Sequence, residues 1–242
     1  CALCAVFFWW SNPSLQTERA TFTSPRLSAG FDGCTIVQLS DLHGAEFGKD
    51  NETLIRQVRE AGPDYIFLTG DLLDRYRQTP RRYAVSLGEA LAEIAPTYFV
   101  TGNHEWAFPD IRGFKRELED AGVTVLSNEY VSLSRNGDHI LLAGIDDPNG
   151  FADQKTPSEL AGELRAAEPE AFWMLLAHRN NYFEKEYSFL GADLVISGHG
   201  HGGVIRLPFT DGLLSVERSF FPSYTAGFYE ANGGKVFVSR GL

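Results

Sequence analysis

The chain has 242 residues, of which 43% are hydrophobic and 22% are charged, a balance typical of one globular domain rather than a disordered or fibrous protein. Its formal net charge is −11, so its surface repels phosphate backbones and we expect no nucleic-acid partner. The charge does not exclude a small anionic substrate, because bound cations would reverse the local field. The three cysteines, at positions 1, 4 and 34, do not form a disulfide framework.

The first ten residues, Cys1 to Trp10, are apolar and uncharged. They are too short to cross a bilayer, which takes about 20 residues. We interpret residues 1–10 as the remnant of an N-terminal membrane anchor, with the two tryptophans at the membrane interface; a short helix packed on the domain is the alternative. The polar residues 11–33 are expected to form a linker or an extended segment.

A repeating pattern of apolar runs and amphipathic segments begins at residue 34. The runs at 34–40, 65–69 and 97–101 are predicted strands, and the segments at 51–60, 80–94 and 109–121 are predicted helices. Gly62, Pro96 and Gly122 provide the stop signals for these helices. The alternation of strand and helix favours an α/β fold.

The pattern changes after residue 122. Strand-like runs at 123–126, 130–134 and 139–145, separated by turn residues such as Asn136-Gly137, predict a hairpin-rich second sheet. Thr156-Pro157-Ser158-Glu159 predicts the capped start of a helix. Further strands are expected at 172–177, 194–197 and 236–239. We therefore expect one domain over residues 34–242, with two packed sheets and helices outside them.

Five short blocks of polar residues follow or end the predicted strands. They are Asp41-Leu42-His43, Gly70-Asp71-Leu72-Leu73-Asp74, Gly102-Asn103-His104-Glu105, Ala177-His178-Arg179 and Gly198-His199-Gly200-His201-Gly202-Gly203. All but one of the six histidines lie in these blocks. Each block alone would be an ordinary turn or surface segment, but together they place oxygen and nitrogen ligands at one edge of a layered fold. This distribution indicates a metal site.

The spacing within two blocks suggests how ligands are shared. In extended backbone Asp41 and His43 point to the same side, because side chains repeat every two residues, and both then reach one ion. His199 and His201 follow the same rule and could divide between two ions. Mixed oxygen and nitrogen ligation without thiolate suits manganese, iron or zinc, and the sequence does not choose among them.

In this order the blocks resemble those of the calcineurin-like metallophosphoesterases, whose pattern is D-x-H, G-D-x-x-D, G-N-H-E/D, H and G-H-x-H, over about residues 34 to 240. The resemblance implies a four-layer α/β/β/α sandwich of two packed mixed sheets flanked by helices, and a centre of two divalent ions. It assigns the first ion to Asp41, His43, Asp71 and His201. It assigns the second to Asp71, Asn103, His178 and His199.

The resemblance also implies a reaction: hydrolysis of a phosphodiester or pyrophosphate by a metal-bridging hydroxide, with His104 assisting the leaving group. Glu105 is expected to orient the His104 ring, and Asp74 to support His43 or a loop. Arg179 is a candidate contact for a substrate phosphate, although a solvated arginine is an equally good interpretation.

The branch that the chain most resembles consists of bacterial single-domain members with an N-terminal anchor, so we expect a catalytic domain associated with the bacterial cell membrane. Some anchored relatives cleave the lipid-linked sugar nucleotide UDP-2,3-diacylglucosamine, which is the alternative substrate. Aromatic residues at 182, 183, 187 and 189 could line a groove for it, or belong to the core. A non-catalytic metal-binding scaffold and a protein phosphatase are further alternatives. Gly200, where relatives often carry threonine, and Asn180-Asn181 after Arg179 depart from the family pattern.

Overall fold

A computed structural model describes residues 15–76, 80–150, 154–203, 220 and 223–242. The apolar segment 1–10, predicted to be an anchor remnant, lies outside these ranges. Within them, no helix combines the length and the apolar character that crossing a membrane requires.

Ten strands and four α-helices make up the described fold. The strands are β1 (Ile36–Leu39), β2 (Tyr65–Leu68), β3 (Thr97–Phe99), β4 (Thr124–Val125), β5 (Glu129–Arg135), β6 (Asp138–Ile145), β7 (Trp173–Arg179), β8 (Leu194–Gly198), β9 (Gly227–Ala231) and β10 (Gly234–Val238). The α-helices are α2 (Glu52–Ala61), α3 (Arg82–Ala92), α4 (Ile111–Asp120) and α5 (Pro157–Ala167). Short 3-10 helices are η1 (Ala29–Phe31), η2 (Lys49–Asn51), η3 (Glu105–Ala107), η4 (Asn180–Tyr182) and η5 (Tyr187–Phe189).

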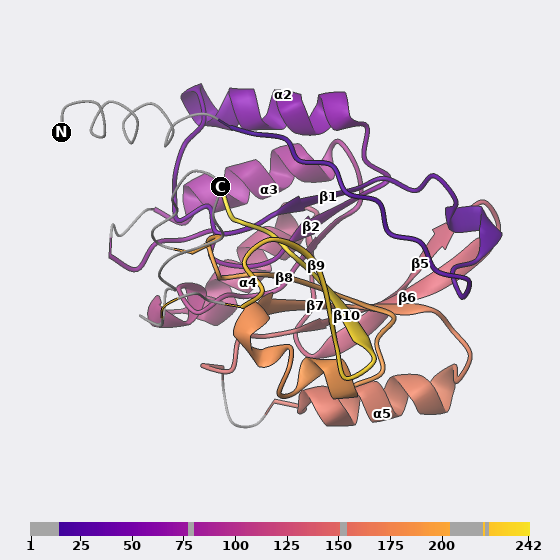
Figure 1. Cartoon of the computed structure of the whole chain (residues 1–242). Coiled ribbons are helices and arrows are strands. Elements are labelled where there is room, and N and C mark those ends of the chain that lie inside the picture. Colours follow the sequence, from indigo (N-terminus) through magenta and orange to yellow (C-terminus); the bar gives the residue numbers. More distant parts are fainter. Residues whose placement is uncertain (1–14, 77–79, 151–153, 204–219, 221–222) are drawn as a thin grey trace.

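The strands form two sheets. The first has the order β1-β2-β3-β4 and is parallel throughout, and the second has the order β5-β6-β7-β8-β10-β9 and is mixed. Helices α2 and α3 cover one side of the molecule and α5 the opposite side, with the sheets between them (Figure 1). The predicted fold class, two packed sheets flanked by helices, is confirmed.

Three apolar clusters fill the three spaces between these four layers. Alternation along the strands divides their side chains: Ile66 and Leu68 of β2 pack toward α2, α3 and α4, whereas Tyr65 and Phe67 pack between the sheets. On the other side, Trp173 and its alternate neighbours in β7 pack toward α5. Because each sheet buries both faces, its strands consist of almost continuous apolar runs.

Two expectations about the second half of the chain need correction. Residues 123–126 were expected in a hairpin-rich second sheet, but β4 pairs in parallel with β3 and extends the first sheet. The hairpin of β5 and β6 does form, and Asn136 and Gly137 at its turn both have positive φ, as a tight two-residue turn requires. The second expectation omitted β9, which pairs antiparallel with β10.

The predicted start of α5 is confirmed. The Thr156 side chain accepts a hydrogen bond from the Glu159 amide, and the Glu159 carboxylate accepts one from the Thr156 amide, which makes a complete capping box. At the carboxyl end of α2, Gly62 terminates the helix in the left-handed conformation, as predicted.

Gly144 in β6 sets how closely the two sheets approach. A Cβ atom built there would lie 2.7 Å from Cγ1 of Val100 and would also overlap Leu126, both of the first sheet's layer. We expect Gly144→Ala to destabilise the protein by about 1–3 kcal/mol, because a packed core has no room for an added methyl group. Urea denaturation measures this, with Gly162→Ala as the control. No atom lies within 4 Å of that added Cβ on α5. Equal stability of the two variants would contradict this account of the sheet spacing.

Candidate metal centre

All five motif blocks lie at the carboxyl ends of parallel strands. Asp41 follows β1, Asp71 follows β2 and Asn103 follows β3, in the first sheet. From the second sheet, His178 lies in the last part of β7 and His199 follows β8. The candidate centre is therefore built from both sheets, where their strands end side by side.

The backbone of this region is unusual, because five of the seven predicted ligands have positive φ. These are Asp41 (56°), His43 (48°), Asp71 (54°), His199 (69°) and His201 (49°). Side chains other than glycine rarely adopt this conformation. The prediction that Asp41 and His43 lie in extended backbone and point to the same side by strand alternation is therefore wrong. Their side chains converge through left-handed turns. Such strain concentrates at functional sites.

One group of ligand atoms comprises Asp41, His43 and His201, within 4.8 Å of one another. Nε2 of His43 lies 3.0 Å from Nε2 of His201, and that atom lies 3.6 Å from Oδ1 of Asp41. The fully buried Asp41 carboxylate accepts hydrogen bonds from Oγ of Ser40 at 2.6 Å and from the His199 amide at 3.0 Å. Its position is therefore fixed by neighbours on two strands.

A second group comprises Asp71, His178 and His199, also within 4.8 Å. Oδ2 of Asp71 lies 3.2 Å from Nε2 of His178 and 3.8 Å from Nε2 of His43, so this carboxylate lies between the two groups. Oδ1 of Asn103 approaches Nε2 of His178 to 3.3 Å. The Thr69 carbonyl lies 2.8 Å from Nδ1 of His178. Because a carbonyl only accepts, Nδ1 carries the proton when the ring is neutral and Nε2 faces the group.

The charges of the second group are strongly coupled. Burial disfavours ionisation of Asp71, yet the neighbouring His178 charge outweighs it and holds the pKa of this carboxyl below its usual range. Burial also opposes the charge on His178, but the Asp71 carboxylate raises the pKa of that ring to about 10. Burial and the charge of His178 lower the pKa of His199 to about 2. A buried carboxylate that holds a cation beside it fits a site for divalent ions.

His104 lies beside this centre. Its ring centroid is 4.4 Å from that of His43, and its amide donates to Oδ1 of Asp71 at 2.8 Å. Nδ1 lies 3.6 Å from Oδ1 of Asp74 and accepts a hydrogen bond from the Arg75 amide at 3.3 Å. Burial lowers the pKa of His104, while the carboxylates of Asp71 and Asp74 oppose the shift. The His104 ring thus packs against that of His43, a predicted ligand.

Glu105 is fully buried and occupies a different position from the one expected. Its two carboxylate oxygens accept hydrogen bonds from the amides of Asp71 (2.8 Å), Leu73 (2.9 Å) and Gly102 (2.7 Å). The side chain thus joins the loop after β2 to the loop after β3, instead of orienting the His104 ring. Burial and the Asp71 charge raise the pKa of Glu105 to about 7.

Arg179 is neither a solvated arginine nor free to move. Its Nε and Nη2 atoms donate to the buried Asp147 carboxylate at 2.6 and 3.1 Å. The Asp147 amide donates to Oγ1 of Thr101, which connects this pair to the loop that carries Asn103. Sequence reasoning missed Asp147, although the acidic pair directly after β6 ends a buried strand as the motif blocks do.

The two departures from the family pattern meet in the structure. A Cβ atom at position 200 would overlap Nδ2 of Asn180, and the same nitrogen donates to the Tyr224 carbonyl at 2.7 Å. Asn180 therefore occupies the space of the side chain that Gly200 lacks. Of the two interpretations of the aromatic residues at 182–189, the core is confirmed for Phe183 and Tyr187, which are buried in the cluster between the second sheet and α5.

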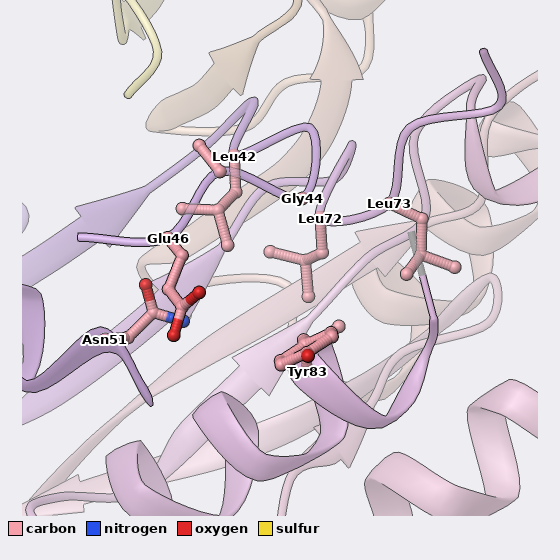
Figure 2. Close-up of a pocket in the computed structure, with 9 residues that line it drawn as sticks. Leu42, Gly44, Glu46, Asn51, Leu72, Leu73 and Tyr83 are labelled. Atoms are coloured by element: carbon pink, nitrogen blue, oxygen red, sulfur yellow. The ribbon is translucent and has the colours of Figure 1, made fainter. Parts of the chain in front are cut away.

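A small cavity of about 140 Å³ lies beside the loops that follow β1 and β2, against Tyr83 of α3 (Figure 2). Leu42, Leu72, Leu73 and Tyr83 line it, together with the polar Glu46 and Asn51. Two of these leucines directly follow the ligands Asp41 and Asp71 in sequence. The cavity is smaller than the roughly 300–1,000 Å³ of ligand pockets. The apolar side chains that line the cavity pack against these loops.

Solved structures with similar folds share this arrangement of layers. The chain aligns with a dimetal phosphatase from Danio rerio at a TM-score of 0.53 and 12% identity, covering 86% of this chain and 87% of that one. It aligns with the NAD nucleotidase of Haemophilus influenzae at a TM-score of 0.54 and 16% identity, covering 85% and 44%. At these identities the likeness defines the class of fold.

Sequence comparisons define the family. The calcineurin-like phosphoesterase family model matches residues 34–203. The chain is 31% identical over 233 residues to the uncharacterized metallophosphoesterase YkuE of Bacillus subtilis, covering 94% of this chain and 78% of that protein. It is 32% identical over 228 residues to a transmembrane protein with metallophosphoesterase domain from Bos taurus, covering 89% and 50%. The chain therefore belongs to the calcineurin-like phosphoesterase family, and it is a metal-dependent phosphohydrolase.

Glu105→Ala tests how the two ligand loops are joined. In metal-free protein we expect a loss of at least about 2 kcal/mol, because buried amides are left without acceptors. The pKa of Glu105 in the folded protein, about 7, lies above the ordinary 4.5. The stability that Glu105 contributes to the wild-type protein is therefore complete at low pH and falls as pH rises through 7. Urea denaturation in chelator at pH 5 and pH 8 measures both effects. Glu163→Ala, an exposed glutamate paired with Lys155, is the control. An equal loss for both variants would contradict the joining role.

Proposed function

We propose that the chain hydrolyses phosphodiesters or pyrophosphates at a centre of two divalent ions. The observation that carries this proposal is the position of Asp71, whose carboxylate lies between the group around His43 and the group around His178. A carboxylate shared in this way suits a pair of ions about 3.5–4 Å apart. We assign the first ion to Asp41, His43, Asp71 and His201. We assign the second ion to Asp71, Asn103, His178 and His199.

Two ions at these ligands would neutralise phosphoryl oxygens and acidify a water molecule for attack on phosphorus. The protein itself supplies the proton for the leaving oxygen, and His104 is the candidate because its ring adjoins His43 at the edge of the ligand groups. Burial lowers the pKa of the ring, but the Asp74 carboxylate, 3.6 Å from Nδ1, raises it and so favours the protonated form that this role requires. In that form Nδ1 donates toward Asp74 and no longer accepts from the Arg75 amide. Manganese, iron and zinc all suit the mixed oxygen and nitrogen ligands.

The first test compares hydrolysis of bis-p-nitrophenyl phosphate, with Mn²⁺ added, between wild type and two variants. We expect His104→Ala to keep about two ions per chain and to lose roughly 10²–10⁴-fold in kcat, the usual contribution of a general acid. Asp71→Asn should lose metal as well as activity, because it removes a shared charge. Elemental analysis on the same samples gives the ion content.

His139→Ala is the matched control, since His139 is an exposed histidine paired with Glu168 outside the ligand blocks. Wild-type turnover no higher than that of His104→Ala would overturn the proposed reaction. Two bound ions without turnover would instead favour the non-catalytic scaffold. Parallel assays with UDP-2,3-diacylglucosamine and a phosphopeptide separate the lipid-linked and protein substrates from a generic phosphodiester.

A second prediction concerns pH. If the protonated His104 ring is the acid, kcat falls as pH rises through its pKa, which burial lowers from 6.5. The Asp74 carboxylate raises that pKa, so Asp74→Asn should move the falling limb to lower pH. His104→Gln should lack the limb altogether. A pH–kcat profile unchanged by Asp74→Asn would argue that Asp74 acts only on the loop.

A further inference from the structure

The segment that follows β10 crosses from one sheet to the other beside the first group of ligands. The Ser239 amide donates to the Ser197 carbonyl at 2.8 Å, which continues the pairing of β10 with β8. Three residues later the Leu242 amide donates to the Ser40 carbonyl, 3.1 Å away, just after β1. Leu242 also packs against the apolar cluster beneath the first sheet. The segment Ser239–Leu242 therefore connects the ends of β8 and β1.

Gly241 lies at the closest point of this crossing. A Cβ atom built on it would lie 2.9 Å from Cβ of Asp41, 3.4 Å from Nδ1 of His201 and 3.5 Å from Oδ2 of Asp41. Its φ of 79° is in the region that favours glycine. The family match ends at residue 203, so this contact lies outside the segment that defines the family.

Asp41 and the segment around Gly241 are both held by hydrogen bonds at this contact. Asp41 is fully buried, and its carboxylate already accepts hydrogen bonds from Ser40 and from the His199 amide. On the other side, the Gly241 amide donates to Oγ of Ser239 at 3.1 Å, and its neighbours are fixed to both sheets. An added Cβ atom at position 241 would therefore overlap Cβ of Asp41 and would also touch the His201 ring.

We propose that the segment Ser239–Leu242 is a built part of the metal centre and that Gly241 is a positioning residue for the first ion. The inference rests on the proposed assignment of Asp41 and His201 to that ion. The bare Gly241 backbone forms the wall against which these two side chains are held, and it restricts the positions that their ligand atoms occupy. The three atoms nearest to a Cβ atom at 241 all belong to Asp41 and His201, which are both assigned to the first ion.

The test is Gly241→Ala, with Gly233→Ala as its control. Both glycines have φ of 79°, so the backbone strain of alanine is matched, but no atom lies within 4 Å of an added Cβ at 233. Gly241→Ala should weaken the binding of one of the two ions by about 10–100-fold, as substitutions next to metal ligands do. At limiting Mn²⁺ its content should fall from about two ions to about one, while Gly233→Ala keeps two.

Electron paramagnetic resonance gives a readout that a purely structural role would not alter. Paired Mn²⁺ ions are spin-coupled, so losing one ion should convert the spectrum to that of an isolated ion. This readout does not depend on whether the protein is catalytically active. If Gly241→Ala does not fold, Ser239→Ala, which removes only the hydroxyl that accepts the Gly241 amide, should weaken the same ion without a steric overlap.

The outcomes distinguish this proposal from the proposed function. Two tightly bound, coupled ions in both Gly241→Ala and Ser239→Ala would overturn the role of the segment and leave the reaction standing. If the wild-type protein binds two ions but hydrolyses none of the test substrates, the proposed reaction is overturned. The positioning role of Gly241 is then decided by the ion content of the two variants. A wild type that binds no Mn²⁺ would overturn both.

Discussion

Two buried carboxylates impose the main electrostatic constraint on this fold. Asp41 is fully buried and Asp71 is 2% exposed, and a buried charge costs several kcal/mol unless it is compensated. Hydrogen bonds from Ser40, from the amides of His199 and His104, and the charge of His178 compensate them in part. Divalent cations at the proposed centre would complete that compensation. The negative charge of the protein as a whole, −11, also favours cation binding.

The same loops carry five of the twelve non-glycine residues with positive φ in the described structure. Five ligand residues in the left-handed region cost roughly 1–2 kcal/mol each by general measures. The surrounding structure sustains this cost: parallel strands fix where the loops begin, and the Glu105 carboxylate holds the amides of Asp71 and Gly102 in two of them. The ligands are thus held in place by the scaffold before any ion binds, which is the arrangement expected of a preorganised site.

Sequence patterns predicted the ligand blocks and most of the strands and helices. Gly62 after α2 and Thr156 before α5 acted as expected, because capping and stop signals are local chemistry. The placement of β4 depended on pairing with β3, which the sequence of a two-residue strand does not encode. The strand β9 was missed although Asn232-Gly233, both with positive φ, is a strong hairpin signal.

For the site, the identity of the ligand blocks could be predicted but their geometry could not. The order of the blocks and their resemblance to one family indicated the ligand set, whereas the left-handed turns and the main-chain role of Glu105 depend on contacts between loops of different strands. Asp147 and Gly241 are further residues of the site region that the sequence did not predict. Each lies far in sequence from the residues that it contacts, and neither carries a motif.

The division of ligands between the sheets links stability to chemistry. Asp41, His43, Asp71 and Asn103 follow strands of the first sheet, and His178, His199 and His201 belong to the second. No rearrangement within one sheet can therefore restore a distance that is lost between them. Gly144 sets the spacing between the sheets in the core, and the segment Ser239–Leu242 joins them at the rim. In the proposed centre, packing far from the ligands would thus determine whether carboxylates from one sheet and imidazoles from the other can share ions.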